Sequence, residues 1–199
     1  MQAKQLPALK IGRLNHLTIN FHGADLVAEP FQAAMLSTIE TASSVPPLGN
    51  YWPGEGGHNV GLMRGENGGR DYYLIVASGP AAEVRAAYGG HGHETESADS
   101  ASDGLANTRA LLADSKAHPA AKWASEYTAD GHSDFYLGAR RENQIAEAIA
   151  PELFSKGYHW SSTQRSADDA YLMDFEDGWQ HFYDKYAELL VRPVRRKYI

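Results

Sequence analysis

The sequence contains no cysteine. This absence excludes disulfide-stapled scaffolds, thiolate zinc sites and cysteine nucleophiles. It is compatible with any redox compartment, so it does not locate the protein.

Positive charge is also scarce. The 199 residues include 18 Lys and Arg against 25 Asp and Glu, which gives a formal net charge of -7. The basic clusters, Arg140–Arg141 and Arg192–Lys197, are short. Neutralising a phosphate backbone requires clustered Lys and Arg. We therefore expect no nucleic-acid partner.

Long apolar runs are missing as well. Met1–Lys10 is polar, and Leu9–Phe21 is broken by charged residues such as Lys10 and Arg13. A membrane-spanning helix needs roughly 18 or more apolar residues, and a secretion signal needs a charged and then an apolar segment. The sequence thus predicts a soluble protein with no signal peptide and no membrane insertion.

Common catalytic motifs do not occur. No G-x-G-x-x-G or P-loop follows an expected strand, and no serine lies in a G-x-S-x-G turn. Asp174, Glu176 and Asp177 are close in sequence and could pair as acid and base. We favour a solvated acidic rim and expect no enzyme activity and no cofactor. A hydrolase or lyase using this acidic cluster is the weaker alternative.

One loop carries possible metal ligands. His91, His93 and Glu94 offer two imidazoles and a carboxylate within the polar segment Gly89–Ser102. Ligand types without a supporting helix or strand are weak evidence for a site. We favour a solvated polar loop over a metal site.

The first 51 residues differ from the rest. Leu17, Ile19 and Phe21 alternate with polar residues as in a strand, and Phe31–Ala42 has the pattern of a modest helix. The turn-rich stretch Ser43–Pro53 follows. We expect residues 1–51 to form an arm that packs on the main domain or on another subunit. This favours a homo-oligomer.

Residues 52–199 predict a single α+β domain, because strands precede helices and an irregular strand region follows. Strands are expected at Val60–Arg64 and Tyr72–Ala77, helices at Asp103–Asp114, Pro119–Tyr127 and Ala139–Ala150, and a closing strand at Leu189–Val194. The segment Tyr158–Tyr186 concentrates eight aromatic residues and two histidines among charged residues. Flat amphipathic rings are typical of binding surfaces, so the segment indicates recognition rather than catalysis.

Several motifs resemble one known family. They are WPGEGG (52–57), RDYYLIVA (70–77), DGLANTRALLA (103–113), HSDFYLGARREN (132–143), YHWSSTQRSADDAYLMDFEDG (158–178) and VRPVR (191–195). From Trp52 to Arg196 the chain resembles the Lcl C-terminal domain family (DUF1566), which implies a C-type-lectin-like fold. The C-terminal pattern is also similar to the variable region of diversity-generating-retroelement proteins, including phage tail-tip receptor-binding proteins.

The resemblance also implies roles for individual residues. The scaffold positions are Trp160, Ser161, Ser162, Ala170, Tyr171, Phe175, Gly178 and Val191–Arg195. The positions expected to face outward and contact ligand are Gln164, Arg165, Leu172, Asp174, Glu176, Trp179, His181, Tyr183, Tyr186 and Glu188.

The function that follows is a phage-derived, non-enzymatic ligand- or receptor-binding module. Its expected partner is a host surface protein or glycan, and it would act at a virion tail, where homo-oligomers such as trimers occur. The alternative is a prophage or bacterial accessory protein that binds a protein partner in the cytoplasm of the producing cell with the same face.

Overall fold

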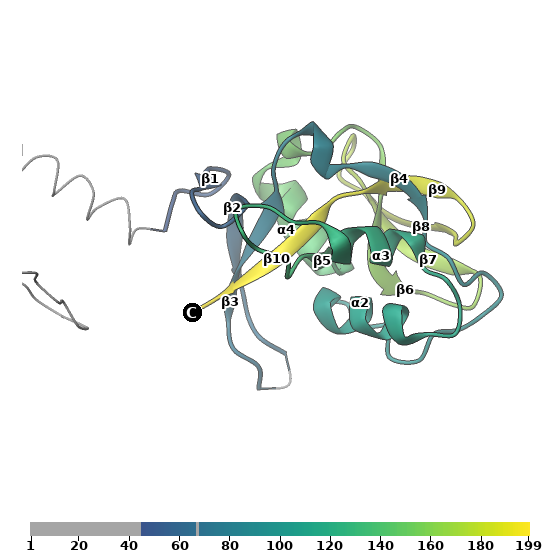
Figure 1. Ribbon diagram of the computed structural model, residues 1–199. Helices are drawn as coiled ribbons and strands as arrows, with labels where there is room; N and C mark the ends of the chain where they lie inside the picture. Colours follow the sequence, from purple (N-terminus) through teal and green to yellow (C-terminus); the bar gives the residue numbers. More distant parts are fainter. Residues whose placement is uncertain (1–44, 67) are drawn as a thin grey trace, which may run out of the picture. The chain divides into compact units, whose positions relative to one another are not determined.

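Two sheets and three α-helices make up residues 45–199 (Figure 1). The structure is a computed structural model that describes residues 45–66 and 68–199. The predicted α+β class is confirmed. The strand expected around Leu17–Phe21 and the helix expected at Phe31–Ala42 lie outside the described residues.

The first sheet has five strands. Their order is β1 (Tyr51–Trp52), β2 (Gly57–Met63), β3 (Tyr72–Ala77), β10 (Pro193–Tyr198) and β5 (Tyr136–Leu137), with every neighbouring pair antiparallel. The hairpin of β2 and β3 is the pair of strands expected near residues 60–64 and 72–77. The expected domain boundary after residue 51 falls inside β1, and the compact unit that contains β1 begins at Val45.

The second sheet also has five strands. Their order is β4 (Val84–Ala87), β9 (Glu188–Val191), β6 (Tyr158–Gln164), β7 (Asp169–Asp174) and β8 (Gln180–Asp184). The β6–β9 pair is parallel and the other pairs are antiparallel. Strand β8 lies at the outer edge, which leaves its side chains less covered than those of β7.

The expected single strand Leu189–Val194 is wrong. The chain leaves β9 of the second sheet at Arg192 and enters β10 of the first sheet at Pro193 (Figure 1). Arg192 is buried at the crossing and donates to the Ala77 carbonyl at 2.6 Å. Pro193 has no N–H to give to a ladder, and this suits the first residue of a strand.

The helices are close to the expected segments. They are α2 (Gly104–Ala113), α3 (Pro119–Glu126) and α4 (Arg140–Ile149), and short 3-10 turns occupy Pro80–Ala82 and Pro151–Leu153. The Asp103 carboxylate accepts the Ala106 N–H at 3.0 Å and so caps the start of α2. Among the helices of the described residues, none has the length and apolar character needed to cross a membrane.

The core covers both faces of β7. Met173 and Phe175 belong to a cluster that includes Ala146 of α4. Leu172 belongs to a second cluster with Trp160 on β6. As expected, Trp160 and Phe175 are core residues. Because β7 lies between two packed layers, four of its six residues are buried and the other two are half-buried.

Candidate functional site

The candidate site is built on the hairpin of β7 and β8. In its register Leu172 lies opposite His181, and Ala170 lies opposite Tyr183. Alternate residues of a strand point to the same face, so His181 and Tyr183 share one side of β8. Phe182 lies on the other side.

The turn between the two strands is held by two carboxylates. Asp174 accepts the Glu176 N–H, and Asp177 accepts the Trp179 N–H, each at 2.9 Å. Gly178 has a φ of 78° in this turn, a conformation that glycine adopts without steric cost. The turn therefore presents Trp179 at a fixed point beside the edge strand. Two carboxylates of the acidic cluster that could have served acid–base chemistry thus brace this turn.

Four rings gather on one side of this hairpin, and we call Tyr158, Trp179, His181 and Tyr183 the aromatic face. The Trp179 and His181 rings are stacked with centroids 6.3 Å apart, and the Tyr158 and His181 rings lie 6.0 Å apart. Trp179 is 67% exposed and Tyr183 is 49% exposed. This is a large aromatic area open to solvent on an ordered element. Tyr158 was not among the residues expected to bind ligand, although it begins the aromatic segment.

Tyr186 is exposed too, but it has different neighbours. Its ring centroid is 5.1 Å from that of His91, and its hydroxyl donates to the Asp184 carboxylate at 3.1 Å. That hydrogen bond and the nearby negative charge raise the pKa of Tyr186. Tyr186 therefore belongs to a polar patch with His91 and Asp184 next to the end of β8.

Three residues expected to face outward are buried instead, which corrects the sequence-based assignment. Leu172 is fully covered on β7, because that strand is packed on both faces. The Gln164 side chain accepts a hydrogen bond from the Lys185 ammonium at 2.8 Å, and it also forms hydrogen bonds with the backbone of Thr95. Asp174 is directed into its own turn. None of these three presents a ligand contact.

The remaining expected contacts are exposed but scattered. Arg165 stacks 3.7 Å from the Phe182 ring centroid, on the side of β8 opposite the aromatic face. Glu176 lies 3.9 Å from Lys156 at the turn. Glu188 is on β9, which is separated from β8 by β6 and β7. The fold therefore brings together Trp179, His181 and Tyr183 but not these three.

The possible metal ligands also separate. His91 lies 3.7 Å from Asp168, whereas His93 contacts Asp114 at 3.1 Å. Within the described part of the chain, no three His, Asp or Glu side chains are grouped as a metal would require. The two histidines of the loop instead contact different carboxylates.

Sequence reasoning missed a buried polar cluster around Asp114. Its carboxylate accepts from Thr95 at 2.5 Å and lies 3.1 Å from His93 and 3.2 Å from His118. The hydrogen bond from Thr95 and the one from His118 lower the pKa of Asp114 well below its usual range. This cluster fastens the 91–95 loop to the end of α2. In the sequence, the only local indication of this cluster is the spacing of Asp114 and His118 by four residues.

Comparison with known proteins adds no assignment. No protein-family model matches the chain, and no curated protein matches it.

Proposed function

We propose that this protein is a non-enzymatic binding module that recognises a host-surface receptor or another protein partner through its aromatic face. The observation that carries this proposal is the exposure of Trp179, His181 and Tyr183 on one side of an ordered edge hairpin. Exposed aromatic groups on a rigid element are typical of interaction sites, because they bury a large area at little entropic cost.

The C-type-lectin-like fold is part of the same proposal. It is supported by two sheets with flanking helices and by a last strand, β10, that pairs with β3 near the start of the domain. The buried Trp160, whose Nε1 donates to the Ala86 carbonyl at 3.1 Å, agrees with its scaffold role in the Lcl C-terminal domain family.

The proposed setting is a phage tail or another host-contact surface. A shallow aromatic face binds weakly alone, and several copies on one particle convert this into tight attachment. Detection of the protein in purified virions would support this setting. Its presence only in the cell extract would favour the cytoplasmic accessory protein that binds a partner with the same face.

Substitution on the two sides of β8 tests the binding face. Trp179→Ala and Tyr183→Ala should weaken capture of a partner by about 2 kcal/mol, or about 30-fold, with little change in melting temperature. The matched control is Phe182→Ala, which removes an exposed ring of the same strand on the opposite side. The assay is pull-down from host lysate and envelope, followed by titration of the captured partner.

Two results would contradict this assignment. Unfolding of the Trp179 and Tyr183 variants would make these residues part of the core. Equal loss of binding with Phe182→Ala would show that the face is not the one proposed.

A further inference from the structure

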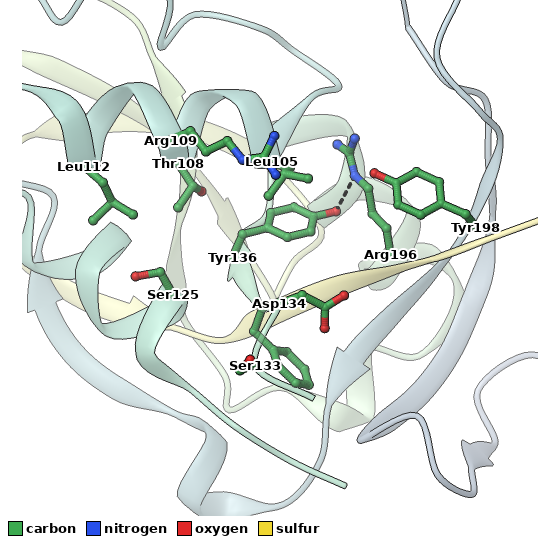
Figure 2. Close-up of a pocket in the computed structure, with 11 residues that line it drawn as sticks. Leu105, Thr108, Arg109, Leu112, Ser125, Ser133, Asp134, Tyr136, Arg196 and Tyr198 are labelled. Carbon is green, nitrogen blue, oxygen red and sulfur yellow. Dashed lines mark hydrogen bonds between the residues drawn. The ribbon is translucent and has the colours of Figure 1, made fainter. Parts of the chain in front are cut away.

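A groove away from the aromatic face lies between α2, α3 and β10 (Figure 2). One wall is a stripe of α2 formed by Leu105, Thr108, Arg109 and Leu112, which are spaced to share a helix face. Tyr136 lines it further, and Arg196 and Tyr198 come from β10. The groove has a volume of about 310 Å³, at the small end of the range for small-molecule sites.

Arg196 is fixed in this groove. Its Nε donates to the Tyr136 hydroxyl at 2.9 Å, and its Nη2 donates to Asp103 at 2.8 Å and to Glu142 at 3.1 Å. Its guanidinium also lies 4.2 Å from the Tyr72 ring centroid. The side chain is only 9% exposed. A planar guanidinium held in this way is already oriented for a further partner.

One nitrogen of that guanidinium is left open. Nη1 of Arg196 has no hydrogen-bond partner among the described residues, and no buried side-chain nitrogen in that part of the chain lacks one. Nη1 must therefore reach solvent. Arg196 lines the groove and the adjoining hollow that extends toward Arg70, and this surface is therefore where we expect Nη1 to open.

Arg109 adds a second positive charge. It lines the same two hollows, it is exposed, and it forms no ion pair with any described residue. The carboxylates nearby have partners: Asp134 pairs with Arg195 at 2.8 Å and Asp103 pairs with Arg196. Glu66, which lines the adjoining hollow, accepts the Ser100 hydroxyl at 3.0 Å. Among the charged side chains that line the groove itself, Arg109 is thus the one without an ion-pair partner in the described residues, and it lies beside the apolar side chains of Leu105 and Leu112.

We propose that this groove binds an apolar carboxylate, with the carboxylate between Arg196 Nη1 and Arg109 and the apolar body against Leu105, Leu112 and Tyr136. Arginine binds carboxylates through directed, charge-assisted hydrogen bonds. A free small acid and the last residue of a peptide both carry this chemistry. The site is independent of the aromatic face.

Titration calorimetry of the full chain tests the proposal with two pairs of probes. The first pair is 4-phenylbutyrate and its primary amide. The second is a short peptide that ends in phenylalanine, with a free or an amidated C-terminus. The acids should bind and the amides should not, and the tighter of the two acids identifies the source of the ligand.

Two arginine variants make the test specific. Arg109→Gln should weaken binding of the acids about tenfold, the effect of losing one charged hydrogen bond. Arg64→Gln removes an exposed charge outside the groove and should have no effect. Trp179→Ala should leave this binding unchanged, which separates it from the proposed function. The proposal is overturned if acid and amide bind alike, if Arg109→Gln binds normally, or if neither acid binds at about 1 mM.

Discussion

At the scale of the residue, the Glu83 carboxylate binds three side chains from different parts of the chain. Its carboxylate lies 2.9 Å from His159, 3.0 Å from Arg192 and 2.6 Å from the Ser155 hydroxyl. Burial alone would raise the pKa of Glu83, but hydrogen bonds from His159, Ser155 and Arg192 lower it far below its usual value. This carboxylate therefore fixes Arg192, where the chain crosses from one sheet to the other.

Glu83→Gln tests this role. At neutral pH it leaves the buried Arg192 without its carboxylate, and we expect a loss of about 3 kcal/mol in the free energy of unfolding. Because the folded pKa is depressed, the contribution of Glu83 is present above its unfolded pKa of about 4.3 and is lost as pH falls below it. Urea unfolding from pH 7 to pH 3 should show a smaller acid-induced loss in the variant than in the wild type. If the free energy of unfolding falls equally with pH in the variant and in the wild type, Glu83 has no role in acid stability.

The resemblance to the Lcl C-terminal domain family and the charges along the last segment predicted the place of several residues. Trp160 and Phe175 were expected in the core and are there, and Trp179 and Tyr183 were expected at the surface and are there. Leu172 was misplaced because alternation along a strand does not reveal whether one face or both faces are covered. Gln164 was wrongly expected at the surface, because the residue that binds it in the interior, Lys185, follows β8 and is distant in sequence.

At the scale of the element, one carboxylate binds the starts of both α2 and α4, in addition to the Asp103 cap of α2. Glu142 Oε2 accepts the Ala139 N–H at the start of α4 at 2.8 Å and the Gly104 N–H at the start of α2 at 3.2 Å. Its other oxygen accepts the Tyr72 hydroxyl at 2.6 Å. A Cβ on Gly104 would lie 2.3 Å from Glu142 Oε2 and 2.5 Å from the Ala139 nitrogen. The two helices meet so closely here that no side chain fits.

Gly104→Ala should therefore destabilise the protein, although this substitution stabilises most helices. Alanine in place of glycine normally favours a helix by about 1 kcal/mol. Here the overlap with Glu142 and with backbone should cost about 3 kcal/mol in the free energy of unfolding. Chemical denaturation measures this, with Ala106→Gly at an exposed position of the same helix as the control, expected to cost about 1 kcal/mol. A stabilised Gly104→Ala variant would contradict the close approach.

Element positions were easier to predict than element partners. Strand β3 has the expected bounds, and α2 and α4 begin and end within one residue of the expected segments. These elements carry local signals in periodicity and capping. The division of the closing strand at Arg192 has only Pro193 as a local signal, because it depends otherwise on contacts of Arg192 with Glu83 and Ala77.

For the whole molecule, the class was predictable and the topology was not. The order of elements indicated α+β. The insertion of β10 between β3 and β5 rests on pairs such as Val194 with Val76, which are far apart in sequence. The aromatic face shares this dependence, since Tyr158 and His181 come from different strands and meet only in the folded sheet.

The assembly of the chain is a prediction at this largest scale. Residues 45–199 contain complete sheets and their own core clusters, so a chain that begins at Val45 should unfold cooperatively. Leu17, Ile19 and Phe21 form an expected apolar strand, and such strands tend to be paired or covered. We therefore expect the full chain to form a homo-oligomer, a trimer if it acts in a tail, and the shortened chain to be monomeric. Light scattering at micromolar concentration compares the two masses. Monomeric full-length protein would remove the assigned role of the arm, whereas an oligomer of the shortened chain would move the contact to residues 45–199.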